Sequence, residues 1–93
     1  MSKEQLTGIW IPANVWLDLR LTLQEKHFLV EIARLSGPDG CCANNAYFAK
    51  YFNISTVRVS QVIMSLVRKE IVEWSVLPGQ QRTLKCLVDV ETR

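Results

Sequence analysis

Several polar side chains recur along residues 56–68 at spacings that place them on one side of a helix. Gln61 carries an amide that can pair with the N6 and N7 atoms of adenine. Ser60 and Thr56 carry hydroxyl groups that can bond several base edges. A helix lying in the major groove distinguishes base pairs through contacts of this kind. The segment therefore predicts a surface that reads DNA.

The same side of this segment carries cationic and apolar side chains. Val57 can contact a thymine methyl group, whereas Arg58 can either bond guanine or hold a phosphate. No acidic residue occurs on this side before Glu70, which argues against an ordinary solvated helix face. The outward set comprises Thr56, Val57, Ser60, Gln61, Met64, Ser65 and Arg68, with Arg58 on its flank.

Phosphate contacts are expected around this surface. Lys50 and Tyr47 project from a helix predicted over residues 45–52, and Arg82 and Lys85 are expected to alternate outward on a later strand. Backbone amides at helix starts also bind phosphate. Such contacts set the register of a protein on DNA without reading its sequence. The expected DNA contacts are Asn45, Tyr47, Lys50, Ser55, Thr56, Val57, Arg58, Ser60, Gln61, Met64, Arg68, Arg82 and Lys85.

A first helix is expected over residues 22–36. Thr22 and Glu25 have the spacing of a capping box, in which each side chain bonds the backbone amide of the other residue. Apolar residues then recur at spacings of three and four, as in an amphipathic helix. Pro38 and the glycines beside it end the helix. The next residues, 41–43, are apolar and predict a small strand.

Two more helices are expected over residues 45–52 and 56–69. Asn44 and Ser55 are good N-caps, and Asn53 tolerates the left-handed conformation that a tight turn between the helices requires. The buried stripe of the second of these helices consists of Val59, Val62, Ile63 and Leu66. The pattern indicates a helix-turn-helix.

After the last of these helices, the spacing of the apolar residues changes to the two-residue alternation that is typical of β-strands. Residues 71–77 and 82–88 alternate in polarity around a turn at 78–81, which predicts a β-hairpin. Trp74 is expected to pack the hairpin against helix 56–69. The resulting order of helix, short strand, helix, helix and hairpin is that of a winged helix-turn-helix, an α+β fold.

The chain resembles the helix-turn-helix family found at the front of phage and plasmid replication proteins and in related small regulators. The shared pattern is carried here by Ile11-Pro12, Gly40-Cys41, Asn44…Phe48-Ala49, Ser55…Val59-Ser60…Ile63…Leu66, Ile71-Val72 and Arg82…Leu84. It covers about four fifths of the chain. The family usually has glycine where this chain has Glu70. We therefore expect the helix to lack its usual left-handed cap and the connection to the hairpin to differ.

Composition limits the other functions of the chain. Its 93 residues suffice for one domain. No apolar run is long enough to span a membrane and no signal peptide is evident, so a cytoplasmic location is expected. Residues 50–88 carry six basic and two acidic side chains, whereas the whole chain has a net charge of only +2. The three cysteines and single histidine have no zinc-site spacing. No catalytic motif is present, so we expect neither enzyme activity nor a cofactor or metal.

The expected organisation is an apolar arm over residues 1–21, a DNA-binding domain over 22–89 and a tail over 90–93. Trp10 and Trp16 in the arm either close over the first helix or form a homodimer contact, and both interpretations bury them. The sequence leaves this choice open.

The sequence thus predicts a protein that binds double-stranded DNA, and the resemblance implies that its site is a replication origin or operator of a mobile element. The alternative is a winged-helix module for protein interaction or oligomerisation, which the low net charge and the apolar arm favour.

Overall fold

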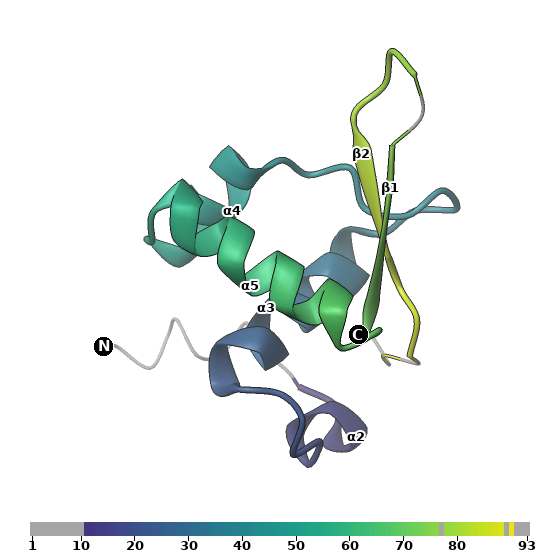
Figure 1. Ribbon diagram of the computed structural model, residues 1–93. Helices are drawn as coiled ribbons and strands as arrows, with labels where there is room; N and C mark the ends of the chain where they lie inside the picture. Colours follow the sequence, from purple (N-terminus) through teal and green to yellow (C-terminus); the bar gives the residue numbers. More distant parts are fainter. Residues whose placement is uncertain (1–10, 77, 89, 91–93) are drawn as a thin grey trace.

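The computed structural model describes residues 11–76, 78–88 and 90, and it shows an α+β arrangement (Figure 1). Its elements are helices α2 (Ala13–Trp16), α3 (Leu23–Leu35), α4 (Asn45–Phe52) and α5 (Thr56–Arg68) and strands β1 (Val72–Val76) and β2 (Arg82–Cys86). The two strands form an antiparallel sheet. Helix α5 packs against α3, α4 and β1, and α3 also packs against β2. This arrangement is compatible with a small winged-helix-like domain.

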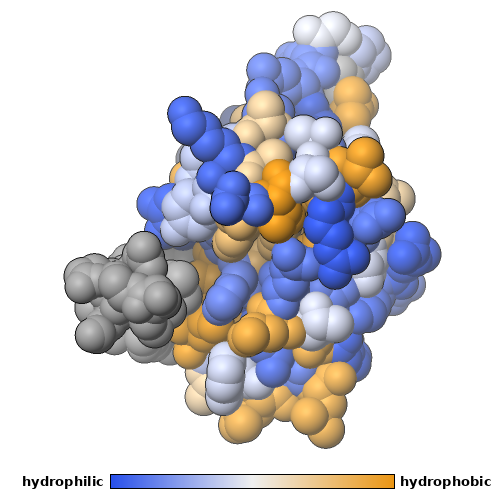
Figure 2. Space-filling model, turned by 90° about the vertical axis from the view of Figure 1, so that its left-hand side faces the viewer, coloured by the Kyte–Doolittle hydropathy of each residue, from blue (hydrophilic) through white to orange (hydrophobic). Residues whose placement is uncertain are grey.

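The N-terminal segment contributes to the core but leaves apolar residues exposed. Val15 and Leu21 are buried, whereas the Trp16 side chain is 51% exposed and lies under the ammonium group of Lys26, at 5.0 Å from its ring. The expected burial of Trp16 within this chain is therefore not observed. Trp10 lies outside the described residues. Figure 2 shows hydrophobic residues gathered at the lower end of the molecule, where α2 lies in Figure 1.

Helix α3 begins with the capping box expected from the sequence. The Thr22 hydroxyl accepts from the amide of Glu25 at 3.1 Å, and the Glu25 carboxylate accepts from the amide of Thr22 at 2.8 Å. After α3 the chain turns at Gly37–Gly40, where Gly40 has a φ of 98°. A Cβ atom on Gly40 would lie 2.6 Å from Cγ2 of Thr83, so both the conformation and the space require glycine here.

The strand expected over residues 41–43 is reduced to one isolated bridge. Cys41 exchanges both backbone hydrogen bonds with Leu84, at 2.8 and 2.9 Å, and its side chain is buried. Cys42 is already exposed, because the chain leaves the sheet there and turns toward α4. A single bridge is enough to hold the approach to α4 against β2.

Helices α4 and α5 meet over the tight turn that the sequence predicts. The Asn44 side chain caps α4 by accepting from the amide of Tyr47 at 2.9 Å, and Ser55 caps α5 in the same way. Asn53 between them has φ 57° and ψ 52°, the left-handed conformation. Local side-chain chemistry therefore fixes where α5 begins and how it turns away from α4.

The core lies where α3, α4 and α5 meet the base of the hairpin. The stripe Val59, Val62, Ile63 and Leu66 is buried as predicted, and burial of each such side chain contributes about 1.5–3 kcal/mol. Phe28 of α3 stacks on Phe48 and Phe52 of α4, with ring centroids 5.4 and 4.5 Å apart. Packing on this stripe leaves the opposite face of α5 exposed.

The apolar residues of the hairpin are only partly buried. Val72 and Leu84 are buried, but Trp74 is 42% exposed and Val76 53% exposed. Trp74 is therefore only partly covered at the place where the sequence predicts that it packs the hairpin against α5. Val76 lies where the strands extend beyond the helices, as Figure 1 shows. Trp74 lies opposite the buried Leu84, but it borders an open pocket between the hairpin and the start of α4.

Glu70 forms the left-handed cap that we expected the C-terminus of α5 to lack. Its φ is 60°, and its amide donates to the carbonyl of Val67 at 3.0 Å. The amide of Ile71 donates to the carbonyl of Leu66, also at 3.0 Å. These two bonds form a Schellman motif. The expectation was wrong because a non-glycine residue can take this conformation at a cost of about 1–2 kcal/mol.

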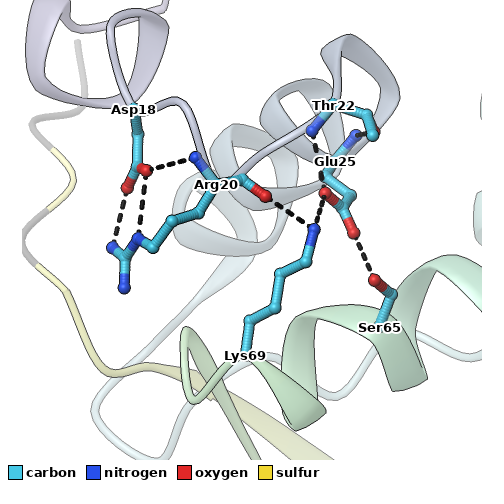
Figure 3. Close-up of polar contacts among 6 residues, drawn as sticks. All are labelled: Asp18, Arg20, Thr22, Glu25, Ser65 and Lys69. Atoms are coloured by element: carbon cyan, nitrogen blue, oxygen red, sulfur yellow. Dashed lines mark hydrogen bonds and ion pairs between the residues drawn. The ribbon is translucent and has the colours of Figure 1, made fainter.

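A partly buried ion pair ties the start of α3 to the end of α5 (Figure 3). The ammonium group of Lys69 lies 2.7 Å from Oε1 of Glu25 and also donates to the carbonyl of Arg20. Ser65 donates its hydroxyl hydrogen bond to Oε2 of the same carboxylate. Burial alone would raise the pKa of Glu25, but the bonds from Lys69, Ser65 and Thr22 outweigh it and lower the pKa. The carboxylate therefore stays charged and holds α5 in place.

Candidate nucleic-acid interface

The most exposed line of α5 follows Val57, Gln61, Met64 and Arg68. Their spacing of four, three and four residues keeps them on one face, opposite the buried stripe. Val57 is 66% exposed and Met64 38%, so the line combines apolar and polar groups. All four side chains reach solvent, as the sequence predicts.

The two flanks of this line are held by neighbouring helices. On the α4 side, Nδ2 of Asn45 donates to the hydroxyl oxygen of Ser60 at 3.0 Å. On the α3 side, the guanidinium group of Arg58 donates to Oε1 of Gln24 at 2.9 Å and to Oε1 of Gln61 at 3.3 Å. Arg58 and Gln61 are therefore oriented before any partner binds. Sequence spacing gave no signal for Gln24, which is 34 residues from Arg58.

Ser65 does not belong to the outward face. Its side chain is half-buried and bonds Glu25 of α3, so it serves the network in Figure 3. The helical position of Ser65 lies at the edge of the exposed face, where the neighbouring α3 decides its environment. Thr56 and Ser55 remain exposed, although the Ser55 hydroxyl is engaged in capping α5 through the amide of Arg58.

The charge over α4 and α5 is entirely positive. No Asp or Glu occurs between Asp39 and Glu70, whereas this stretch contains Lys50, Arg58, Arg68 and Lys69. Lys69 is neutralised by Glu25, but the other three form no ion pair within the part of the chain that the structure describes. The exposed cations near α5 thus retain their full attraction for an anion.

Tyr47 faces inward rather than toward a partner. Its hydroxyl donates to the buried carboxylate of Glu31, which also receives Arg34 at 2.6 Å. Burial and this hydrogen bond raise the pKa of Tyr47 to about 12. Burial alone would raise the pKa of Glu31, but the bonds from Arg34 and Tyr47 lower it. Because its hydroxyl is engaged in this network, Tyr47 does not belong to the candidate interface, although the sequence predicts it as a DNA contact.

Arg82 and Lys85 point to opposite faces of β2, because residues of odd and even number alternate along a strand. Arg82 shares the face of the buried Leu84, is half-buried, and donates to the carbonyl of Ala43 at 3.0 Å. Its guanidinium group also lies over the ring of Trp74 at 5.5 Å. The expectation that Arg82 alternates outward together with Lys85 is therefore wrong. Lys85 is exposed as expected.

Other functional signals are sparse in the structure. Within residues 11–76, 78–88 and 90, no three His, Cys, Asp or Glu side chains gather as metal ligands would. None of the helices in these same ranges combines the length and apolar character needed to cross a membrane. No protein-family model, curated protein or solved structure matches the chain.

Proposed function

We propose that this protein is a winged helix-turn-helix protein that binds double-stranded DNA, with α5 in the major groove. The observation that carries the proposal is the exposed line Val57, Gln61, Met64 and Arg68 within a stretch that contains no acidic residue. A duplex presents closely spaced negative charges, which such a surface attracts. The turn at Asn53 sets α5 apart from α4 in the manner of a helix-turn-helix.

The side chains of α5 divide between reading bases and holding phosphates. The amide of Gln61 already accepts a hydrogen bond from Arg58, and its NH2 group has no partner among the described residues. That group can donate to a base acceptor, while Val57 and Met64 contact thymine methyl groups. Arg68 and Lys50 hold the phosphates on either side. Asn45 contributes by orienting Ser60.

The hairpin lies beside this surface and supplies further backbone contacts. Lys85 is exposed on β2, and the tip at Gly79 and Gln80 is hydrophilic (Figure 2). The resemblance described above further suggests a replication origin or an operator of a mobile element as the target. Bound protein would then act by occupancy, either recruiting or blocking other machinery.

Selection of binding sites from random duplexes tests the proposal. The expected result is one enriched sequence whose affinity falls with salt, with a slope of about −3 to −4 if Lys50, Arg58, Arg68 and Lys85 each neutralise a phosphate. A palindromic sequence would also indicate a dimer. Failure to enrich any sequence, with no duplex binding at low salt, would overturn the proposal.

A second candidate function is protein interaction through the N-terminal segment. Trp16, Leu17, Leu19 and Leu23 are 51%, 70%, 97% and 55% exposed, an unusual gathering of large apolar side chains on a small chain. Self-association measured by sedimentation would support it if Leu19→Ser and Leu17→Ser weakened the association. Strong self-association without duplex binding favours this second function over the first.

A further inference from the structure

A pocket lies between the start of α4 and the hairpin. It has a volume of about 320 Å³ and is lined by Cys42, Asn44, Asn45, Trp74, Gln81 and Arg82. The segment that leads into α4 runs beside β2 here, since Cys41 is bridged to Leu84 (Figure 1). The pocket is large enough for a flat ring of two fused cycles.

Two side chains that line this pocket each hold a buried polar atom without a hydrogen-bond partner among the described residues. These atoms are Oδ1 of Asn45, an acceptor, and Nε of Arg82, a donor. Each unsatisfied buried group costs about 1–3 kcal/mol. Both atoms are closed to solvent as the side chains stand, so Asn45 and Arg82 must turn toward the pocket before a ligand reaches them. A ligand edge that offers one donor and one acceptor would then remove both costs, whereas an anion would leave the Asn45 oxygen unpaired.

Trp74 gives the pocket an aromatic wall. Its ring is 42% exposed, and the guanidinium group of Arg82 lies over it at 5.5 Å. Aromatic and guanidinium planes are the groups on which unpaired bases stack. A flat ring can take the place of the Arg82 guanidinium on the indole, which frees the Arg82 Nε–H to reach the edge of that ring.

We propose that this pocket binds an unpaired purine base, stacked on Trp74 and bonded along its edge by Asn45 and Arg82. Adenine offers an adjacent donor and acceptor at N6 and N7, which match the two unsatisfied atoms. The choice of a nucleobase rests on the proposed function, because Asn45 bonds Ser60 on the exposed face of α5 and so joins the pocket to the duplex-binding surface. The base belongs either to a DNA strand or to a free nucleotide.

Fluorescence titration distinguishes these two sources. The protein carries Trp10→Phe and Trp16→Phe so that Trp74 alone reports, and the probes are an eight-residue deoxyadenylate strand and adenosine monophosphate. We expect the strand to quench Trp74, and Trp74→Ala in the unmodified chain to weaken strand binding about 10- to 100-fold. Quenching by the monophosphate at equal affinity would assign the pocket to a free nucleotide. Absence of quenching by both probes would overturn the proposal.

Matched variants separate a pocket from a general loss of structure. Trp74→Phe keeps an aromatic wall and is expected to retain most of the affinity, whereas Trp16→Ala removes an exposed tryptophan far from the pocket and should change nothing. Equal weakening by Trp74→Ala and Trp16→Ala would contradict the pocket. Gln61→Ala should leave strand binding intact while it weakens duplex binding. If the protein still binds the single DNA strand but binds no duplex, the result counts against the proposed duplex-binding function and not against the pocket.

Discussion

The Glu25 carboxylate and the Lys69 ammonium group, 44 residues apart in sequence, lie 2.7 Å apart and join the first turn of α3 to the end of α5. Glu25 also forms the capping box with Thr22 and accepts the hydroxyl of Ser65. One side chain thus caps α3 and fixes the position of α5. This network and the turn at Asn53 together fix the orientation of α5, and so they determine which of its faces is exposed.

Removal of the cation should leave Glu25 buried and poorly compensated. Lys69→Met is expected to lower the free energy of unfolding by about 2–3 kcal/mol, because Lys69 is partly exposed and water compensates some of the loss. Urea denaturation measures this change. Lys85→Met, which removes an exposed lysine, should alter stability by less than about 0.5 kcal/mol. Equal effects of the two substitutions would show that the ion pair does not stabilise the fold.

Acid should destabilise the protein through the buried carboxylates Glu25 and Glu31. The pKa values of Glu25 and Glu31 are lowered in the folded state from an ordinary value of 4.5. Their contribution to stability is therefore complete above pH 4.5 and is lost as the pH falls through the folded pKa. Thermal unfolding between pH 3 and pH 7 measures it. Glu25→Gln should flatten the acid limb of this curve, and an unchanged limb would contradict the assignment.

Glu70 offers a stabilising substitution. Glu70→Gly should raise the free energy of unfolding by about 0.5–1 kcal/mol, because glycine takes a positive φ without the cost that glutamate incurs. Glu70→Ala removes the same charge but keeps the unfavourable conformation. Chemical denaturation of both variants should therefore show stabilisation that is larger for glycine. If alanine matched glycine, the charge and not the backbone would be responsible.

Gly40 should tolerate no side chain. Gly40→Ala forces a Cβ against Thr83 and against the carbonyl of Leu84, and it also places alanine at a φ of 98°. We expect a loss of at least about 2 kcal/mol. Gly37→Ala is the matched control, since nothing lies within 4 Å of the place that its Cβ atom would occupy. Thermal unfolding compares the two, and similar stability of both variants would contradict the close approach of residues 40 and 83.

Structural features that depend on residues close together in the sequence could be predicted from the sequence. The capping box at Thr22, the turn at Asn53 and the buried stripe of α5 each depend on residues a few positions apart, and the structure confirms them. Contacts between residues far apart in the sequence could not be predicted. The Glu25–Lys69 ion pair and the Tyr47–Glu31 bond join residues 44 and 16 positions apart, so only the packing of the helices brings them together.

The hairpin shows a second limit of sequence patterns. Alternation indicates which residues share a face of a strand, but it does not show how far the neighbouring layer extends. Trp74 and Leu84 are cross-strand partners, yet only Leu84 is buried. Glu70 shows a third limit, because the absence of glycine did not prevent the left-handed cap.

The most direct test of the account is the affinity of Gln61→Ala for the duplex sequence that the unmodified protein selects. Gln61 is exposed, so its loss should leave folding unchanged. We expect at least a tenfold weaker affinity for the selected duplex, relaxed discrimination at one base pair, and unchanged affinity for an unrelated duplex. Equal affinity of the variant and the unmodified protein for the selected duplex, with discrimination intact, would contradict the assignment of α5 as the reading helix.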